Sequence, residues 1–214
     1  MKFVLLPFLL IAFLGHSQDP SRFKEEVADI EKKYDSLWDP SQETIVFTGS
    51  SSIRTWDDLE EKLPNSQIVN TGFGGSQASD LLAYSKELIL KYNPKKVFIY
   101  EGDNDISAHK KSKEIITTVK SIIDKIKANT NAEMVIIIAA KPSIVRWHLK
   151  RKYKRLNRKF KRLCKKDNLL EFADIWKPML HRRKLKQDIY IKDGLHMNAK
   201  GYELWYPVIK QFIN

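Results

Sequence analysis

Short apolar runs alternate with longer stretches of mixed polarity along most of the chain. The short runs are rich in β-branched residues and have the length of buried strands; they lie at residues 44–48, 67–70, 96–100, 133–140 and 169–172. The longer stretches have the spacing of amphipathic helices and lie at residues 22–38, 57–62, 78–92, 112–128, 146–166 and 199–212. Strand and helix therefore alternate through the chain.

This alternation predicts an α/β fold. Strands separated by helices form parallel sheets with helices on both faces, so we expect a three-layer α/β/α sandwich around a central, mainly parallel five-stranded sheet. With 214 residues, 43% of them hydrophobic, the chain suits one such domain, which we place at residues 18–214. In these sheets ligands bind beyond the carboxyl ends of the strands, and polar residues that follow the strands are the candidates for a site.

The first residues have the pattern of a secretory signal peptide. Lys2 precedes an apolar run at residues 3–14, and the small residues Gly15 and Ser17 follow it. This run is shorter than the about 17–25 residues that a membrane-spanning helix needs. We therefore predict a signal peptide at residues 1–17, cleaved near Ser17, and a secreted, periplasmic or surface protein of a bacterium. An uncleaved membrane anchor is the alternative.

The single cysteine, Cys164, excludes an intramolecular disulfide. An exported chain without disulfides relies on its own core for stability. No Cys-His pattern accompanies Cys164, and we expect it to be a small buried side chain rather than a nucleophile.

Most of the formal net charge of +12 is concentrated in one segment, since residues 146–166 contain twelve Lys and Arg and no acidic residue. Apolar side chains recur there every three or four residues, which is typical of an amphipathic helix. Such a basic face attracts polyanions, so we consider contact with an anionic surface through residues 146–166; a solvated helix face is the simpler alternative. Nucleic acid is not expected as the partner of an exported protein.

Four polar motifs carry the chemistry of a serine hydrolase between them. Three follow the first three predicted strands, and the fourth lies near the carboxyl terminus; they are Gly-Ser-Ser-Ser at 49–52, Gly-Phe-Gly-Gly at 72–75, Gly-Asp-Asn-Asp at 102–105 and Asp-Gly-Leu-His at 193–196. Serine supplies a nucleophile, histidine a base and aspartate its orienting partner. Glycine and asparagine supply N–H donors that stabilise an oxyanion.

Each motif taken alone also has a simpler explanation. Serines cap helices, and Asp193 and His196 fit a surface turn as well as a helical turn that places both on one face. A dinucleotide loop is excluded because Gln77 stands where its last glycine belongs. Residues 102–105 lack the EF-hand pattern for Ca²⁺.

Zinc has little support, because the remaining histidines have no ligand spacing to one another or to a cysteine; these are His109, His148 and His181. We therefore expect no metal or organic cofactor.

The four motifs in this order resemble the SGNH subfamily of GDSL-type esterases and lipases, over the span from Ile45 to His196. The resemblance implies the flavodoxin-like SGNH hydrolase fold. It also implies that the catalytic residues are Ser51, Asp193 and His196, and that the oxyanion hole is formed by Ser51, Gly75 and Asn104. The family's Gly-Asp-Ser-Leu is Gly-Ser-Ser-Ser here, so Ser50 replaces the aspartate and Ser52 remains the alternative nucleophile.

We expect a serine esterase that hydrolyses short-chain carboxylic esters through an acyl-enzyme. By resemblance, O-acetyl groups on a carbohydrate or similar small molecule are the favoured substrate, with Trp56, Phe73 or Trp147 as aromatic walls for a sugar. Ordinary packing is the alternative role for each of these rings. The competing hypothesis is a non-catalytic module of the same fold that binds anionic polysaccharide or a membrane surface through its basic helix.

Overall fold

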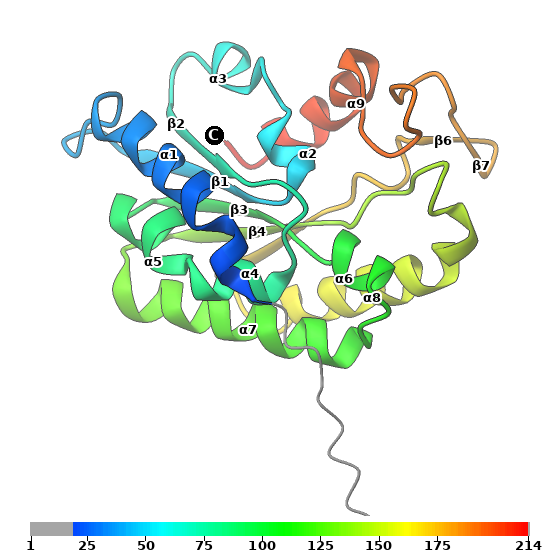
Figure 1. The fold of residues 1–214 in the computed structure, drawn as a ribbon, viewed down its shortest axis with the longest axis horizontal. Helices are drawn as coiled ribbons and strands as arrows, with labels where there is room; N and C mark the ends of the chain where they lie inside the picture. Colours follow the sequence, from blue (N-terminus) through cyan, green and yellow to red (C-terminus); the bar gives the residue numbers. More distant parts are fainter. Residues whose placement is uncertain (1–18, 214) are drawn as a thin grey trace, which may run out of the picture.

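Five parallel strands form the central sheet in the computed structural model, which describes residues 19–213 (Figure 1). The strands are β1 (Thr44–Gly49), β2 (Gln67–Gly72), β3 (Lys96–Tyr100), β4 (Met134–Ile138) and β5 (Leu170–Ala173). Their order in the sheet is β2-β1-β3-β4-β5, and every neighbouring pair is parallel. The chain passes from β1 outward to β2 and then crosses back to β3, so the strand order switches direction between β1 and β3. This is where ligands bind in open α/β sheets.

Helices cover both faces of the sheet and complete a three-layer sandwich, which confirms the predicted fold class (Figure 1). One face packs against α1 (Lys24–Asp35), α4 (Ala78–Ala83), α5 (Ser85–Leu88), α7 (Ser112–Asn129) and α8 (Lys150–Cys164). The other face packs against α2 (Ser51–Arg54), α3 (Leu59–Lys62) and α9 (Ala199–Lys210).

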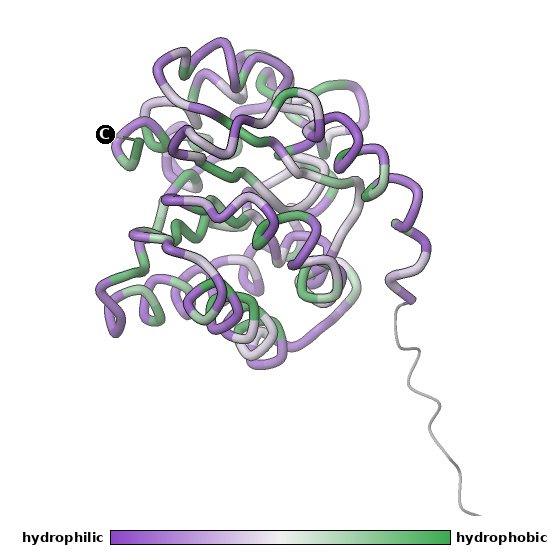
Figure 2. Tube along the Cα trace, turned by 90° about the vertical axis from the view of Figure 1, so that its left-hand side faces the viewer, coloured by the Kyte–Doolittle hydropathy of each residue, from purple (hydrophilic) through white to green (hydrophobic). Residues whose placement is uncertain are grey.

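Side chains of successive strand residues point to opposite faces of the sheet. Each strand therefore contributes residues to the two hydrophobic cores that lie on these faces. In β1, Val46 belongs to the core under α7 and α8, whereas Phe47 belongs to the core under α9. Phe47 stacks on Phe98 of β3, with ring centroids 4.2 Å apart. Figure 2 shows the result, because hydrophobic segments run through the interior of the trace and the outer turns are mainly hydrophilic.

The structure departs from the sequence prediction at several boundaries. The single helix predicted at residues 78–92 is wrong, because the chain leaves helical geometry at Tyr84 and again at Ile89 and forms α4, α5 and a 3₁₀ turn, η2 (Leu90–Tyr92). The Tyr84 hydroxyl donates to the carbonyl of Pro20, 3.0 Å away, and so ties this break to the start of the described chain. Strand β4 is shorter than predicted.

Several short elements had no prediction. The helix α6 (Asp103–Ser107) follows β3, and a small hairpin of β6 (Leu180–His181) and β7 (Lys184–Leu185) precedes the last helix. Two 3₁₀ turns, η1 (Pro20–Phe23) and η3 (Trp147–Leu149), lead into α1 and α8.

Within residues 19–213, no helix combines the length and the apolar character needed to cross a membrane. The predicted signal peptide at residues 1–17 lies outside the described residues.

Candidate active site

Ser51 lies at the carboxyl end of β1 because Gly49 permits a sharp turn there. Gly49 has φ +120°, and a Cβ atom at this position would lie 2.1 Å from the carbonyl oxygen of Tyr100. Only glycine tolerates both this dihedral and this approach. The turn is fixed by the Ser50 N–H, which donates to the same Tyr100 oxygen at 3.1 Å. Helix α2 then begins at Ser51, directly beyond the sheet edge.

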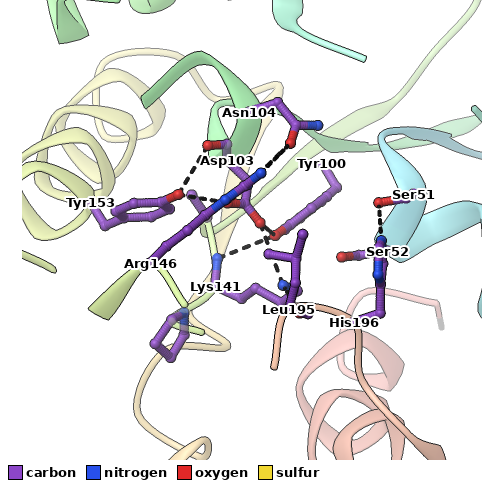
Figure 3. Close-up of polar contacts among 12 residues, drawn as sticks. Ser51, Ser52, Tyr100, Asp103, Asn104, Lys141, Arg146, Tyr153, Leu195 and His196 are labelled. Atoms are coloured by element: carbon purple, nitrogen blue, oxygen red, sulfur yellow. Dashed lines mark hydrogen bonds and ion pairs between the residues drawn. The ribbon is translucent and has the colours of Figure 1, made fainter. Parts of the chain in front are cut away.

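His196 meets Ser51 from the other end of the chain (Figure 3), and Asp193 bonds the far side of its ring. The Nε2 atom of His196 lies 2.9 Å from the Ser51 hydroxyl oxygen, and its Nδ1 atom lies 2.5 Å from the Asp193 carboxylate. Serine, imidazole and carboxylate thus form one hydrogen-bonded line. Both donor–acceptor distances are short enough for proton transfer.

The segment that carries Asp193 and His196 is a tight turn, so of the two alternatives the surface turn is correct and the helical turn is wrong. Gly194 has φ +63°, and Asp193 closes the turn by accepting the backbone N–H groups of Leu195 and His196 at 2.8 and 2.9 Å. The same carboxylate holds the imidazole with its other oxygen. Desolvation opposes ionisation of Asp193, but the hydrogen bonds from His196 and from the two backbone N–H groups outweigh it and lower the pKa to about 2. Asp193 is therefore ionised at neutral pH.

Ser52, the alternative nucleophile, shares no hydrogen bond with His196 in the described structure. It is buried, with 3% of its surface exposed, and its carbonyl accepts the Tyr202 hydroxyl at 2.9 Å. Ser51 is the serine that shares a hydrogen bond with His196.

The three N–H groups predicted for the oxyanion hole belong to Ser51, Gly75 and Asn104, and the structure shows which of them are already bonded. The backbone N–H groups of Ser51 and Gly75 have no acceptor among residues 19–213. Gly75 is exposed and has φ +71°, and a Cβ atom at this position would have no neighbour within 4 Å. The Asn104 amide donates one hydrogen to the carbonyl of Ser76 at 2.8 Å, and its second hydrogen is free for a ligand.

Buried carboxylates hold the loop that carries Gly75. Glu101 accepts the Ser76 hydroxyl at 2.7 Å, and Asp80 and Asp105 accept the next two backbone N–H groups, at 2.9 and 3.2 Å. Burial raises the pKa of Glu101 well above its usual range, and the charge of Asp105 adds to the effect. Both effects favour the protonated form of Glu101 beneath the loop.

Asp103, next to Asn104, is the centre of a buried charge network (Figure 3). Arg146 donates to it at 2.6 Å, Lys141 lies 3.4 Å away, and the Tyr100 and Tyr153 hydroxyls donate at 2.9 and 2.7 Å. Desolvation opposes ionisation of Asp103, but the positive charges of Lys141 and Arg146 outweigh it and lower the pKa to about 2.

This network contacts both Asn104 and the turn that carries His196. Arg146 also donates two hydrogen bonds to the side-chain oxygen of Asn104, at 3.0 and 3.1 Å, which turns the amide nitrogen toward the Ser51 side. Lys141, only 1% exposed, donates to the carbonyl of Leu195 at 2.7 Å and so holds the residue before His196.

Sequence reasoning missed Lys141 and Arg146. The signal was present, because both follow the fourth predicted strand, at the edge where the other motifs converge. Arg146 was assigned to the basic helix instead, and Lys141 carried no motif.

The aromatic walls predicted from the sequence are wrong for two of the three rings. Trp56 and Phe73 are 1% and 0% exposed and belong to the cores. Trp147 is partly buried and stacks on Trp176, with centroids 6.3 Å apart. Apolar groups near the site come instead from Ile144 and Val145, which are 41% and 51% exposed. Their N–H groups donate to the carbonyl of Gly194, in the turn of Asp193 and His196.

Within the described part of the chain, no group of three or more His, Cys, Asp or Glu side chains is arranged to hold a metal ion.

The fold and this site together define a hydrolase of the α/β/α class, and comparison with known proteins agrees. The model of the GDSL-like lipase/acylhydrolase family matches residues 35–204. The chain belongs to this family and is a carboxylic ester hydrolase. Because the chain is an ester hydrolase, the alternative hypothesis of a non-catalytic module with the same fold is not supported. The search of curated proteins finds no match to the chain.

Solved structures with the same fold cover most of the chain. A protein from Streptococcus pneumonia is 22% identical, with a TM-score of 0.77 over 91% of this chain and 95% of that one. A GDSL-like lipase from Bacteroides thetaiotaomicron is 22% identical, with a TM-score of 0.72 over 90% and 96%. An acetylxylan esterase from Geobacillus stearothermophilus is 17% identical, with a TM-score of 0.65 over 79% and 93%. At these identities the likeness concerns the fold.

Proposed function

We propose that the protein is a serine esterase in which Ser51 is the nucleophile, His196 the general base and Asp193 its orienting partner. The Ser51 oxygen attacks the ester carbonyl carbon while His196 Nε2 takes the hydroxyl proton. Asp193, ionised and bonded to Nδ1, stabilises the imidazolium that forms. His196 then returns the proton to the alkoxide leaving group, and an acyl-Ser51 ester and a free alcohol result.

The oxyanion of the tetrahedral intermediate is met by the N–H groups of Ser51 and Gly75 and by the Asn104 amide. These donors are already oriented before the reaction, so they cost little reorganisation when charge develops. Arg146 contributes by fixing the Asn104 amide through its oxygen.

A second half-reaction releases the acid. His196 takes a proton from water as the water oxygen attacks the acyl carbon, and the bond to Ser51 breaks as the proton passes to the serine oxygen. The enzyme is restored, and one ester and one water have become one acid and one alcohol. The chain's own residues supply every proton transfer in this scheme.

For the substrate, we propose short acyl esters, with an O-acetyl group on a carbohydrate as the favoured case. Support comes from the open setting of the site, where His196 is 28% exposed, and from the small apolar area that Ile144 and Val145 add beside it. The fold neighbour that is an acetylxylan esterase agrees with this choice. We also propose that residues 18–214 form one exported domain, on the basis of the amino-terminal signal pattern.

The observation that carries the proposal is the hydrogen-bonded line from Ser51 through His196 to Asp193. Turnover of p-nitrophenyl acetate tests it in the wild type and in Ser51→Ala, Ser52→Ala and His196→Ala. We expect Ser51→Ala and His196→Ala to lose activity to a similar extent, because members of a triad act as a unit, and Ser52→Ala to retain it. Wild-type activity in Ser51→Ala would disprove the mechanism.

A further inference from the structure

A basic cavity lies between α8 and the segment that connects α6 to α7. Its volume is about 400 Å³, and its floor includes the buried side chain of Ile106. Six cationic side chains line it, and no carboxylate does; they are Lys110, Lys111, Lys113, Lys152, Arg155 and Lys159.

Five of these six cations have no ion-pair partner within residues 19–213. The exception is Lys110, whose ammonium lies 3.8 Å from Asp105 and bonds the Ser79 hydroxyl at 3.0 Å. Like charges that face one cavity repel each other, and an anion in the cavity relieves this repulsion.

The helix contributes one ordered row of charges to this cavity. Lys152, Arg155 and Lys159 are spaced by three and four residues, which places them along one flank of α8. The apolar face of α8 points into the core. The connecting segment contributes the facing row, and it begins with His109 in the left-handed region at φ +63°.

The cavity lies at the same end of the sheet as Ser51. In parallel βα units each helix begins near the carboxyl ends of the strands, and the cavity is lined by the segment that enters α7 and by α8 from its first turn to Lys159. The five-residue helix α6 joins the two regions, because it carries Asn104 near its start and Ile106 near its end. A polymer held in the cavity therefore lies at the edge of the sheet where the esterase site opens.

We infer that this cavity binds an anionic polysaccharide through its sulfate, phosphate or carboxylate groups. A membrane surface fits less well, because basic interfacial sites pair their charges with exposed apolar side chains. The large exposed apolar residues of the described chain are Leu37, Ile144, Val145 and Ile191, and none of them lines the cavity. Single-stranded nucleic acid is held mainly by stacking on aromatic rings, and the lining has no Phe, Tyr or Trp.

The test measures binding of a fluorescein-labelled heparin oligosaccharide by anisotropy, with neutral dextran as the negative control. The cavity variant combines Lys152→Gln, Arg155→Gln and Lys159→Gln. We expect its affinity to fall about tenfold or more at low salt, and the dependence of affinity on salt to become shallower, because fewer counterions are displaced.

A matched control variant lies on the other flank of the same helix. It combines Lys154→Gln, Arg158→Gln and Lys161→Gln, with the same residue types and the same loss of charge. We expect it to weaken binding less than about threefold. Both variants should keep the wild-type melting temperature and the wild-type turnover of p-nitrophenyl acetate, since neither touches the esterase residues.

Equal weakening in the two variants would overturn the inference, because net charge alone would then explain binding. Binding that is unchanged in the cavity variant would overturn it as well. A third arm uses vesicles of phosphatidylcholine and phosphatidylglycerol: if the cavity variant loses vesicle binding but keeps heparin binding, the partner is a membrane and the inference fails. These binding results do not depend on catalysis, so a wild type without turnover would refute the esterase mechanism alone.

Discussion

Lys141 offers a sharp test of how the buried charge network supports catalysis. Its ammonium lies 3.4 Å from the Asp103 carboxylate and donates to the carbonyl of Leu195 at 2.7 Å, next to His196. The substitution Lys141→Met keeps most of the side-chain volume and removes the charge and both contacts. We predict that it lowers both the stability of the fold and the turnover number.

The loss of stability follows from the partners that remain. Removing one member of a buried ion pair costs about 3–5 kcal/mol when it leaves the other charge unpaired. Asp103 keeps Arg146 at 2.6 Å and the Tyr100 and Tyr153 hydroxyls, so we expect the lower cost of about 2–3 kcal/mol. For a chain of this size that corresponds to a fall of about 5–10 °C in melting temperature.

The loss of activity follows from the turn that Lys141 holds. A displacement of 1 Å at a catalytic group costs about 100-fold in rate. The turn keeps the hydrogen bonds from Ile144 and Val145 to Gly194, so its movement is smaller. We predict that kcat falls about tenfold, while KM stays near the wild-type value because Lys141 is buried and does not face the substrate.

Steady-state kinetics with p-nitrophenyl acetate, together with thermal melting, measures both effects. Lys161→Met is the control, because it makes the same chemical change at an exposed position of α8. If Lys141→Met melts lower but keeps the wild-type kcat, Lys141 has a structural role only. An unchanged melting temperature would refute the reasoning about the network.

Three other substitutions test separate parts of the site. Asn104→Ala should lower kcat by about 10²–10³ with little change in KM, because the amide acts on the oxyanion of the transition state; an unchanged kcat would remove it from the oxyanion hole. Burial raises the pKa of Glu101 above the usual value of 4.5, so its protonated form stabilises the fold and that stability is lost as pH rises through the raised pKa. Between about pH 5 and pH 8 the melting temperature of Glu101→Gln should therefore fall less than that of the wild type, and parallel melting curves would contradict this. Gly49→Ala should unfold several degrees lower, because its Cβ would meet the Tyr100 carbonyl at 2.1 Å; a wild-type melting temperature would show that the turn can adapt.

The layers of this fold and the positions of its strands along the chain were accessible from the sequence because local patterns determine them, whereas the order of the strands in the sheet was not predicted. Five apolar runs gave the five strands to within a few residues, and β3 was predicted with its observed bounds. The break within residues 78–92 was not accessible. Apolar periodicity continues through Tyr84, and the contact of its hydroxyl with Pro20 is a tertiary interaction that the periodicity does not report.

The site was predictable to the extent that each role required a particular residue type. Serine, histidine, aspartate and asparagine stood at the expected places, and the structure brings Ser51, His196 and Asp193 together. The turn geometry was left open because an i, i+3 spacing suits both a helical turn and a surface turn. Here Gly194 in the left-handed region favours the turn.

The supporting charges could not be recognised in the same way. Lys141 and Arg146 are common surface residue types, and their roles depend on burial beside Asp103, which lies 38 and 43 residues earlier in the chain. The parallel pairing of β3 with β4 places the segments that follow these two strands side by side and so brings Asp103 close to Lys141.

The central claim is that Ser51 is the residue that becomes acylated. Reaction with the serine-directed reagent diethyl p-nitrophenyl phosphate, followed by intact-mass and fragment-ion spectrometry, tests it directly. We predict one diethylphosphoryl group per chain, attached to Ser51, with the same labelling in Ser52→Ala and none in Ser51→Ala. Labelling of Ser52 in the wild type, or labelling that persists in Ser51→Ala, would contradict the account.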